Sequence, residues 1–424
     1  MSALAKYLLS FGFQVSGSDL RASVYTRELE ELGATIVIGH HPEMLENVQM
    51  AVYSDAVRKD DPELKRAEEL GLYILNRSGL LKSVAENFRE VVGVGGCHGK
   101  TTVTCMLAHI YAAANEDFTA HIGGEDKTFS NCVIRGSKLF LTEVCEYKKN
   151  LLDIKCNAAV CLSADADHLD CYSSREELAD CYYTYLKTAD KAIINADDKV
   201  LSAFADLNAV TFGLNKGLYT ADNMKSEKGA YSFDFVKGGE KLCRIKLKVA
   251  GRHNAVNALA AAAVATETGI DIKYIKRGLK NFKGVRRRFE KVGKLNGADV
   301  IIDYAHHPRE IEAALSTARE VYGDKFRAVF QPHTYSRTIF LKDEFIRVLS
   351  EIENPILYKT FPAREEFQPG GSALDLYKDT GERGKYFEDF DELIKYLKNE
   401  AESVEALLIL GAGDLAELIR EYLN

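Results

Sequence analysis

The feature that most constrains this chain is an apolar run that ends in a glycine-rich loop, Val91-Val-Gly-Val-Gly-Gly-Cys-His-Gly-Lys-Thr-Thr102. The run predicts a buried strand, and the residues from Thr101 onward predict a helix. Backbone N–H groups of such a loop and of the helix N-terminus bind phosphate. We expect the Lys100 ammonium to reach the β- and γ-phosphates of a nucleotide, and the Thr101 hydroxyl to bind Mg²⁺. The full G-x-x-x-x-G-K-[ST] pattern is not met, because residue 94 is valine.

Helix and strand patterns alternate along the whole chain, which predicts parallel α/β sheets. We expect three α/β domains. The first is Rossmann-like and covers 1–88, the second is a P-loop ATPase-type domain over 89–284, and the third is Rossmann-like and covers 285–424. The second should combine a parallel sheet with a small antiparallel hairpin, because Tyr231–Val236 and Leu242–Val249 alternate in polarity around a Gly-Gly pair.

The first domain begins with a helical pattern, Ala3–Ser10. A doubly wound nucleotide-binding unit normally begins with a strand and a glycine-rich turn, and that first strand is central in the sheet. We therefore expect this domain to be incomplete at its N-terminus, with two strand edges unpaired. Its strands are predicted at Phe13–Ser16, Thr35–Ile38, Ala51–Tyr53 and Leu72–Leu75.

Composition argues against several classes of protein. Lys and Arg total 55 against 63 Asp and Glu, and this net charge of −8 argues against a protein that coats nucleic acid. No stretch approaches the ~18 apolar residues of a membrane span, and no signal-peptide pattern begins the chain. The 9 cysteines include no C-x-x-C pair, so neither a zinc site nor a thioredoxin motif is indicated. We expect a cytoplasmic protein with reduced cysteines.

Two further predicted strands are followed by groups that bind hard metal ions. Glu143 ends the run Lys138–Thr142, and the loop Ser163–Asp170 follows another strand and contains His168. Ligands of parallel sheets bind at the carboxyl ends of strands, so Glu143 should lie where a phosphate-bound Mg²⁺ needs an oxygen ligand. His168 is a candidate ligand of a second metal ion, although aspartates in such a loop also cap helices.

The rest of the chain carries weaker signals. The segment Gly251–Asn257 begins an alanine-rich helix. Its asparagine side chains could hydrogen-bond to the edge of a purine base, although helix capping explains half of the pattern. The run Arg286–Arg288 is either a solvated face or a clamp on the γ-phosphate. Asp303, with the histidines after it, and the loop Gln331–Thr338 each follow a predicted strand. These two loops suggest a second half-site for a carboxylate or amine substrate.

Together these segments resemble the Mur ligases, in family order and over nearly the whole chain. The segments that carry the resemblance are M-S-A-L-A-K and V-S-G-S-D within Met1–Asp19, G-C-H-G-K-T-T at Gly96–Thr102, T-E-V-C-E-Y at Thr142–Tyr147, D-A-D-H-L-D at Asp165–Asp170, G-R-H-N-A-V-N-A at Gly251–Ala258, D-Y-A-H-H-P at Asp303–Pro308 and F-Q-P-H-T-Y-S-R-T at Phe330–Thr338. The last of these is the most specific and is typical of the members that add alanine.

The resemblance implies an ATP-dependent ligase of peptidoglycan precursor synthesis. Its expected reaction joins L-alanine to the lactyl carboxylate of UDP-N-acetylmuramate through an acyl phosphate and releases ADP and phosphate. The N-terminal domain would hold the UDP-sugar, the central domain ATP with two Mg²⁺ ions, and the C-terminal domain would close over both. The alternatives are a related ligase that recycles tripeptides or adds polyglutamate, or a P-loop nucleotide-binding module without ligase activity. We expect a monomer or weak homodimer, with no nucleic-acid or membrane partner.

The resemblance also implies roles for individual residues. Catalytic roles fall on Lys100, Glu143, His168 and Arg288. The expected nucleotide-binding residues are Gly96, Cys97, His98, Gly99, Lys100, Thr101, Thr102, His253, Asn254, Asn257 and Asp303. The expected substrate-binding residues are Ser18, Asp19, Ser54, His306, His333 and Arg337. The expected metal ligands are Thr101, Glu143 and His168.

Four departures from the family pattern accompany the resemblance. The family has a strand and a G-x-G-G-x-G turn before M-S-A-L-A, so we expect poor UDP-sugar binding that recovers when about 15–20 preceding residues are restored. Cys97 replaces a usual threonine, at little expected cost because its backbone N–H would bind phosphate. Thr334 replaces a frequent arginine. Lysines stand where an acid is common after Glu146, so Glu146 is given no metal role; Lys187 is not assigned the carbamylated-lysine role of some members.

Overall fold

The computed structural model describes residues 1–164, 172 and 174–423. Within them no helix has both the length and the apolar character needed to cross a membrane. The chain forms two compact units. The first comprises Met1–Asn223, Phe233–Ile245 and Val256–Phe282, and the second comprises Met224–Ser232, Lys246–Ala255 and Lys283–Asn424.

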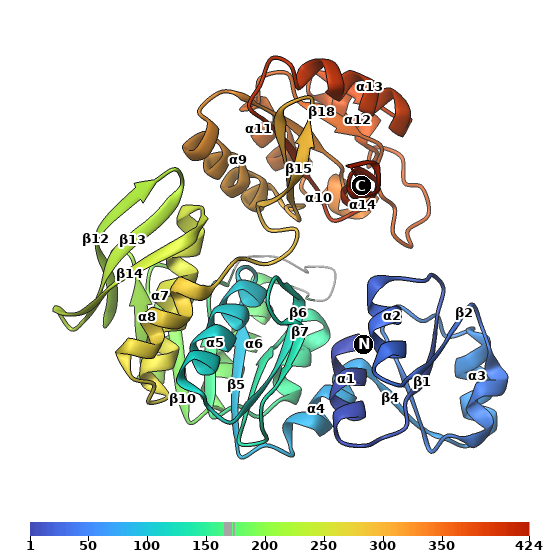
Figure 1. Ribbon diagram of the computed structural model, residues 1–424, viewed down its shortest axis with the longest axis vertical. Coiled ribbons are helices and arrows are strands. Elements are labelled where there is room, and N and C mark those ends of the chain that lie inside the picture. Colours follow the sequence, from blue (N-terminus) through green and yellow to red (C-terminus); the bar gives the residue numbers. More distant parts are fainter. Residues whose placement is uncertain (165–171, 173, 424) are drawn as a thin grey trace. The chain divides into compact units, whose positions relative to one another are not determined.

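The N-terminal part of the first unit has four short strands, which form two separate sheets (Figure 1). β1 (Ser16–Asp19) pairs in parallel with β2 (Thr35–Ile38), and β3 (Met50–Tyr53) pairs in parallel with β4 (Tyr73–Asn76). Among the described residues, each of these strands therefore has one hydrogen-bonded neighbour. The accompanying helices are α1 (Ser2–Ser10), α2 (Val24–Glu31), the 3₁₀ helix η1 (Pro42–Asn47), α3 (Pro62–Glu69) and α4 (Arg77–Ala85).

The prediction of a strand over Phe13–Ser16 is wrong, because the end of α1 uses these residues. The N–H of Gly12 donates to Leu9 O (3.0 Å) and the N–H of Phe13 donates to Leu8 O (3.1 Å). Gly12 has φ +81°, so the segment is a glycine-terminated helix end of the Schellman type. The strand begins only at Ser16.

A ten-stranded sheet of order β14-β13-β12-β11-β10-β9-β5-β8-β6-β7 contains the glycine-rich loop. Its strands are β5 (Glu90–Gly95), β6 (Phe118–Asp126), β7 (Ser130–Ile134), β8 (Leu139–Glu143), β9 (Ala158–Cys161), β10 (Lys191–Asn195), β11 (Val210–Gly213), β12 (Tyr219–Glu227), β13 (Ala230–Lys237) and β14 (Glu240–Ala250). β5 pairs in parallel with both β8 and β9, and its residues from Val91 to Gly95 are buried. The apolar run is therefore an interior strand, and the loop leaves its carboxyl end.

The helices that accompany the ten-stranded sheet include closely packed, buried segments. They are α5 (Lys100–Ala114), α6 (Arg175–Lys187), α7 (Arg252–Glu267) and α8 (Ile272–Asn281), with short 3₁₀ helices η2 (Tyr147–Asp153), η3 (Leu201–Ala203) and η4 (Ala205–Leu207). The alanines of α7 from Ala258 to Ala265 are 0% exposed. A Cβ at Gly278 of α8 would lie 2.4 Å from the Ile110 Cα, so the glycine lets α8 approach α5 closely. The antiparallel hairpin is present, with β13 and β14 joined through Gly238 and Gly239, both at positive φ.

The second unit contains a six-stranded sheet of order β15-β16-β20-β17-β18-β19, in which β15 runs antiparallel to β16 and the other pairs are parallel. Its strands are β15 (Glu290–Leu295), β16 (Ala298–Asp303), β17 (Phe326–Phe330), β18 (Ile356–Tyr358), β19 (Lys385–Phe387) and β20 (Ala406–Leu410). Its helices are α9 (Pro308–Tyr322), α10 (Tyr335–Phe340), α11 (Lys342–Ser350), α12 (Ala373–Asp379), α13 (Phe390–Glu400) and α14 (Leu415–Leu423). Apolar clusters form on this sheet, and the predicted α/β class with mixed sheets is confirmed.

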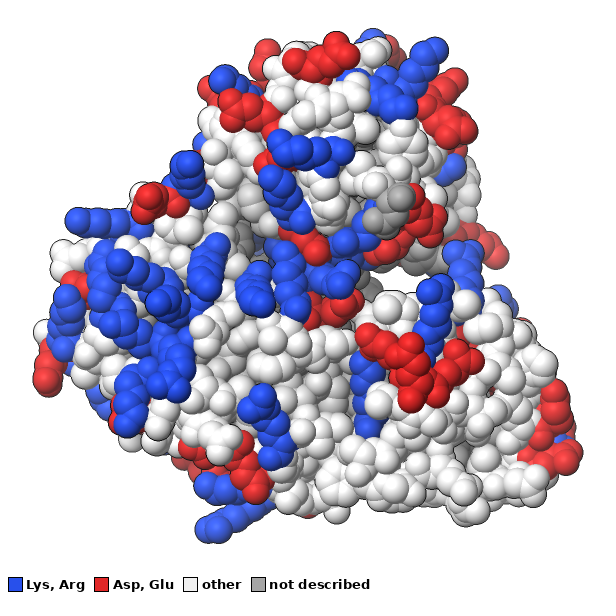
Figure 2. Space-filling view, viewed as in Figure 1, with Lys and Arg blue, Asp and Glu red and all other residues white. Residues whose placement is uncertain are grey.

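Positive charge is unevenly distributed over the surface despite the net charge of −8. Lysine and arginine side chains gather on the face drawn at the left of Figure 2. Helix α8 in the first unit exposes Lys273, Lys276, Arg277 and Lys280. The overall charge therefore does not describe every face of the molecule.

Candidate nucleotide and substrate site

The loop after β5 is shaped by glycines and tied to the end of β9. Gly96 and Gly99 have φ +118° and +85°, and a Cβ at Gly96 would come within 2.8 Å of the Ser163 nitrogen. The Cys97 N–H donates to Ser163 O (3.1 Å), and the His98 N–H donates to Ser163 Oγ (3.2 Å). Helix α5 begins directly after Gly99, and no described side chain caps its N-terminus. The N–H groups of its first turn are thus suited to bind an anion.

Cys97 differs from expectation in one respect. Its N–H, expected to bind phosphate, is already used in the bond to Ser163. Its Sγ lies 3.4 Å from the Tyr182 hydroxyl within the apolar core. The thiol therefore contributes packing, and Thr102, the last residue of the motif, is also buried.

The Lys100 ammonium is held above the loop. Its Nζ donates to Gly96 O (2.6 Å) and lies 3.0 and 3.1 Å from the two carboxylate oxygens of Glu146. The side chain of Glu146 is 0% exposed and that of Lys100 is 16% exposed. Burial acts to lower the pKa of Lys100, but the negative charge of Glu146 outweighs it and raises this pKa well above 10.5. Lys100 therefore stays a cation at the end of β5.

Two of the three predicted metal ligands lie together. The Thr101 hydroxyl donates to Glu143 Oε2 (2.9 Å), and the Gly123 N–H donates to Glu143 Oε1 (2.6 Å). A hydroxyl and a carboxylate are oxygen donors of the kind that Mg²⁺ prefers, so these residues fit that ion. The third predicted ligand, His168, lies outside the described residues.

The expected adenine-binding residues divide between the two units. Asn257 belongs to the first unit and lies against the loop, since a Cβ at Gly99 would come within 2.5 Å of its Oδ1. Asn254 belongs to the second unit, where its Nδ2 donates to Ala250 O (2.6 Å), and His253 stands beside it in sequence. The Asn254 amide therefore donates to the chain before α7 and does not act as an N-cap acceptor.

Asp303 ends β16 in a buried position of the second unit. Its Oδ1 accepts the Ala305 N–H (2.8 Å) and its Oδ2 accepts the Phe289 N–H (2.7 Å). Burial raises its pKa to about 6, although the Arg288 guanidinium acts in the opposite direction. Arg288 itself lies 3.5 Å from Glu310 Oε1. The arginine and the aspartate predicted to act on ATP therefore share one electrostatic environment.

The loops after β16 and β17 come together, as the half-site interpretation requires. The ring centroids of His306 and His333 are 5.9 Å apart, and Arg337 Nη1 donates to His333 O (2.9 Å). His306 Nδ1 lies 2.8 Å from Tyr304 O, so Nδ1 carries the proton of the neutral ring and Nε2 is an acceptor. Burial lowers the pKa of His306 to about 4, which keeps the ring neutral near pH 7.

The three predicted substrate residues of the N-terminal part lie on its two separate sheets. Ser18 and Asp19 end β1, and Ser54 directly follows β3. The Ser18 hydroxyl donates to Glu63 Oε2 (2.6 Å), while Ser54 Oγ accepts the Ala56 N–H (3.2 Å). All three therefore stand at carboxyl ends of parallel strands, where ligands of such sheets bind.

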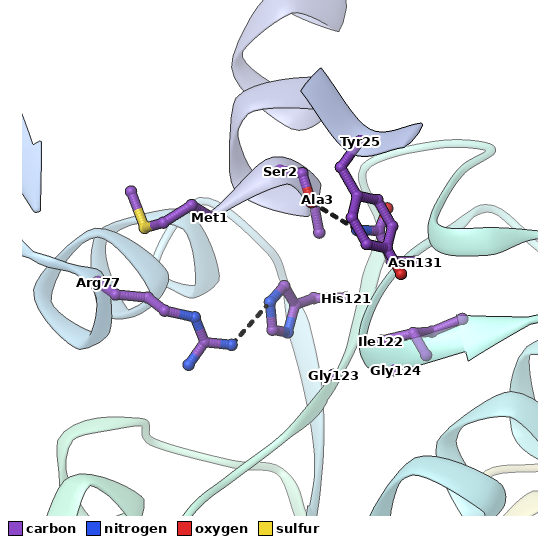
Figure 3. Close-up of a pocket in the computed structure, with 10 residues that line it drawn as sticks. All are labelled: Met1, Ser2, Ala3, Tyr25, Arg77, His121, Ile122, Gly123, Gly124 and Asn131. Atoms are coloured by element: carbon purple, nitrogen blue, oxygen red, sulfur yellow. Dashed lines mark hydrogen bonds between the residues drawn. The ribbon is translucent and has the colours of Figure 1, made fainter. Parts of the chain in front are cut away.

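A pocket of about 160 Å³ that sequence reasoning missed lies between the start of α1 and the strands β6 and β7 (Figure 3). Arg77 and His121 point toward one another there, with Arg77 Nη2 3.3 Å from His121 Nε2. Burial, with the Arg77 charge, lowers the pKa of His121 to about 3. The neutral ring accepts from Arg77, so its Nδ1 donates to Thr142 Oγ1 at 3.2 Å. The guanidinium gives the pocket an anion-binding group, and its position directly after β4 was the available signal.

Comparison with known proteins gives a match over each of the three predicted parts. The models of the Mur ligase family catalytic domain, the Mur ligase middle domain and the Mur ligase glutamate ligase domain match residues 1–89, 94–265 and 287–413. A UDP-N-acetylmuramate–L-alanine ligase of Acetivibrio thermocellus is 38% identical over 437 residues, which cover 100% of this chain and 93% of the relative. The chain belongs to the Mur ligase family. A Clostridium acetobutylicum ligase of the same name is 38% identical over 435 residues, covering 100% of this chain and 95% of the relative.

Solved structures of Mur ligases agree with this membership. The crystal structure of UDP-N-acetylmuramate–alanine ligase from Thermotoga maritima superposes with a TM-score of 0.85 at 28% identity and covers 100% of this chain and 95% of its own. A murein peptide ligase from Psychrobacter arcticus superposes with a TM-score of 0.73 at 21% identity over 100% of this chain and 95% of its own, which shows a shared fold. The three-domain α/β Mur ligase fold is therefore confirmed.

Proposed function

We propose that this chain catalyses the ATP-dependent addition of L-alanine to UDP-N-acetylmuramate in peptidoglycan precursor synthesis. The observation that carries the proposal is the full-length identity of 38% to a relative named for this substrate pair. The geometry agrees with it, because a phosphate loop and two oxygen ligands meet at one sheet edge. We place the reaction in the cytoplasm, where ATP and the nucleotide-sugar are available.

The first step would transfer the γ-phosphoryl group of ATP to the lactyl carboxylate and leave ADP. Lys100 and the first-turn N–H groups of α5 would stabilise charge on the transferring group. Thr101 and Glu143 would hold one Mg²⁺, and Glu143 with His168 a second. Such ions supply positive charge that neutralises phosphate oxygens and the incoming carboxylate.

The remaining contacts to ATP would come from the other predicted residues. His253, Asn254 and Asn257 would bind the adenine, Asp303 the ribose, and Arg288 the γ-phosphate. The half-buried Arg288 is a permanent cation suited to phosphate oxygens. Its ion pair with Glu310 fixes the side chain in the second unit.

In the second step the amine of L-alanine would attack the acyl phosphate and release phosphate. His333 and Arg337 would orient the alanine and muramyl carboxylates, with His306 beside them. Ser18, Asp19 and Ser54 would contact the UDP-sugar. Arg77 in the pocket of Figure 3 adds a guanidinium for an anionic group of the same substrate.

Phosphate release provides the test of this reaction. ATP with UDP-N-acetylmuramate should give little sustained phosphate release until L-alanine is added, and the product should be UDP-N-acetylmuramoyl-L-alanine by mass spectrometry. A preference for a tripeptide over L-alanine would assign the chain to the recycling ligases instead. Phosphate release from ATP at the same rate with and without UDP-N-acetylmuramate and L-alanine would contradict any ligase reaction.

A further inference from the structure

The end of β8 supplies two carboxylates to two consecutive residues of the phosphate loop. Glu143 accepts the Thr101 hydroxyl at 2.9 Å, and the oxygens of Glu146 lie 3.0 and 3.1 Å from Lys100 Nζ. The two acids are three residues apart, and each contacts a different chemical group. Glu143 binds a hydroxyl and an N–H, which a metal ion can replace, whereas Glu146 faces an ammonium.

The position of Glu146 is fixed by its surroundings. Its side chain is 0% exposed, and its backbone carbonyl accepts the hydroxyl of Tyr172 and the N–H of Lys149 (2.9 Å). The next lysines adopt positive φ, and Lys149 turns to an ion pair with Glu177 (2.7 Å). The lysines that follow Glu146 in sequence are therefore directed elsewhere, and the carboxylate faces the Lys100 ammonium.

A lysine is a flexible partner for phosphate, because its four-carbon stem has several rotatable bonds. Holding the ammonium in place before ATP arrives removes that freedom in advance. An ammonium has three N–H donors. Four oxygens lie around that of Lys100, namely Gly96 O (2.6 Å), Cys97 O (3.5 Å) and the two Glu146 oxygens (3.0 and 3.1 Å), so a phosphate oxygen can replace the longest contact while the others are kept. The observed contacts thus allow Lys100 to act on phosphate while it stays anchored.

We propose that Glu146 is a positioning residue that anchors the Lys100 ammonium over the phosphate loop for phosphoryl transfer, and that it acts through Lys100 rather than through a metal ion. The proposal rests on the proposed function for its kinetic consequence. Its structural basis, a fully buried carboxylate within 3.1 Å of the ammonium, does not depend on the identity of the amino acid that is ligated.

The kinetic test compares Glu146→Gln and Glu146→Asp with the wild-type chain. Glu146→Gln should lower kcat about tenfold or more, because the neutral amide no longer holds the ammonium, while KM for L-alanine and UDP-N-acetylmuramate stays within about twofold. Glu146→Asp keeps the charge at shorter reach and should recover part of the loss. The matched control is Glu177→Gln, which removes a carboxylate from an ion pair outside the loop and should leave the rate unchanged.

A double-mutant cycle on ATP binding separates anchoring from a general structural role. Calorimetry with ATP is done on wild type, Glu146→Gln, Lys100→Ala and the double variant. Anchoring predicts that Glu146→Gln weakens ATP binding severalfold in the wild type and has no further effect when Lys100 is absent. An equal loss in both backgrounds would overturn the proposal.

Magnesium titration tests the remaining alternative. The Mg²⁺ requirement of Glu146→Gln should match that of wild type, and a rise as large as that of Glu143→Gln would make Glu146 a metal ligand and overturn the anchoring role. If Glu146→Gln does not fold, Glu146→Asp takes its place in the cycle with the same expected pattern. The double-mutant cycle measures ATP affinity only. Its result therefore tests the anchoring role even if the chain is not a ligase.

Discussion

The central sheet and the N-terminal strands of the first unit differ in how their strands are supported. β5 is hydrogen-bonded to β8 on one side and to β9 on the other, whereas β1 pairs with β2 and β3 pairs with β4 in two separate sheets. The residues of β5 are buried almost throughout, while those of β1 are mostly exposed. The groups expected to bind phosphate therefore rest on a strand fixed from both edges, and those expected to hold the UDP-sugar do not.

The N-terminal part is instead held through contacts to the central sheet. Lys6 of α1 donates to Asn131 Oδ1 on β7 (3.0 Å) and forms an ion pair with Glu28 of α2. Arg77 of α4 contacts His121 of β6.

Apolar residues of α1 and α4, among them Leu4 and Leu81, also share one core with Phe140 of β8. Polar pairs and this apolar packing thus do at this junction what continuous strand pairing does in the central sheet. Changes at the loop should then affect rate most, and changes at the junction should affect stability.

Removing the loop cation should have the largest effect. We expect Lys100→Ala to reduce ligation at least ~10²–10³-fold, the range for losing one group that stabilises transition-state charge. The melting temperature should also fall, because the variant leaves the fully buried Glu146 carboxylate without its ammonium partner. Steady-state kinetics with thermal melting checks both. Lys187→Ala, on the exposed side of α6, is the control, and more than half of the activity remaining in Lys100→Ala would contradict the role of the loop.

Weakening the predicted metal ligand Glu143 should have the next largest effect. Glu143→Gln should raise the Mg²⁺ concentration needed for half-maximal rate sharply, because a neutral amide is a weaker ligand for a hard cation. His168→Ala should raise it less, since His168 is expected to contact only one ion. Magnesium titrations of both variants give the comparison, and a reversed order would contradict the two-ion interpretation.

Sequence reasoning located the strand, the glycine-rich loop and the following helix well because their signals are local. The apolar run before Gly95 and the Lys-Thr pair after Gly99 can be recognised without knowledge of distant contacts. β5 and α5 accordingly lie close to their predicted bounds. β6 and β7 were missed because their buried polar residues break the apolar pattern. His121 and Asp126 are buried only because Arg77 and His109 pair with them, and such pairing is decided by the tertiary fold.

The role of Glu146 was also hidden from the sequence. The lysines after it depart from the family pattern, and on that ground Glu146 was given no metal role. The structure separates them, because positive φ at Lys148 and Lys149 turns their side chains away while Glu146 faces Lys100. Adjacency in sequence is a poor guide to electrostatic partners where the backbone reverses its direction.

Hydrogen exchange tests the difference in strand support directly. Amides of β1 and β3 should exchange at least about tenfold faster than the interior amides of β5, because strands with one partner and less buried residues open locally at lower free energy. Mass spectrometry of peptides from the two regions, measured in one sample, gives the ratio. Equal protection of β3 and β5 would show that the N-terminal strands are as firmly held as the central sheet, and the comparison would fail.

Acid stability tests the junction through His121. Its pKa is lowered to about 3 in the folded chain, against about 6.5 when unfolded. The unfolded state therefore binds a proton that the folded state does not, so the stability from this group is complete above pH 6.5 and is lost as the pH falls toward 3. Between pH 6.5 and 5.5 the loss amounts to about 1 kcal/mol.

His121→Gln should remove this pH dependence while keeping the junction. The glutamine amide can accept from Arg77 and donate to Thr142 as the neutral ring does, but it does not titrate. Urea unfolding at pH 6.5 and 5.5 should therefore show a smaller stability loss for the variant, by about 1 kcal/mol. His40→Gln, whose side chain is 46% exposed in the same unit, is the control and should follow wild type. If His121→Gln loses as much stability as wild type, His121 is not held neutral between Arg77 and Thr142, and the junction must depend on its other contacts.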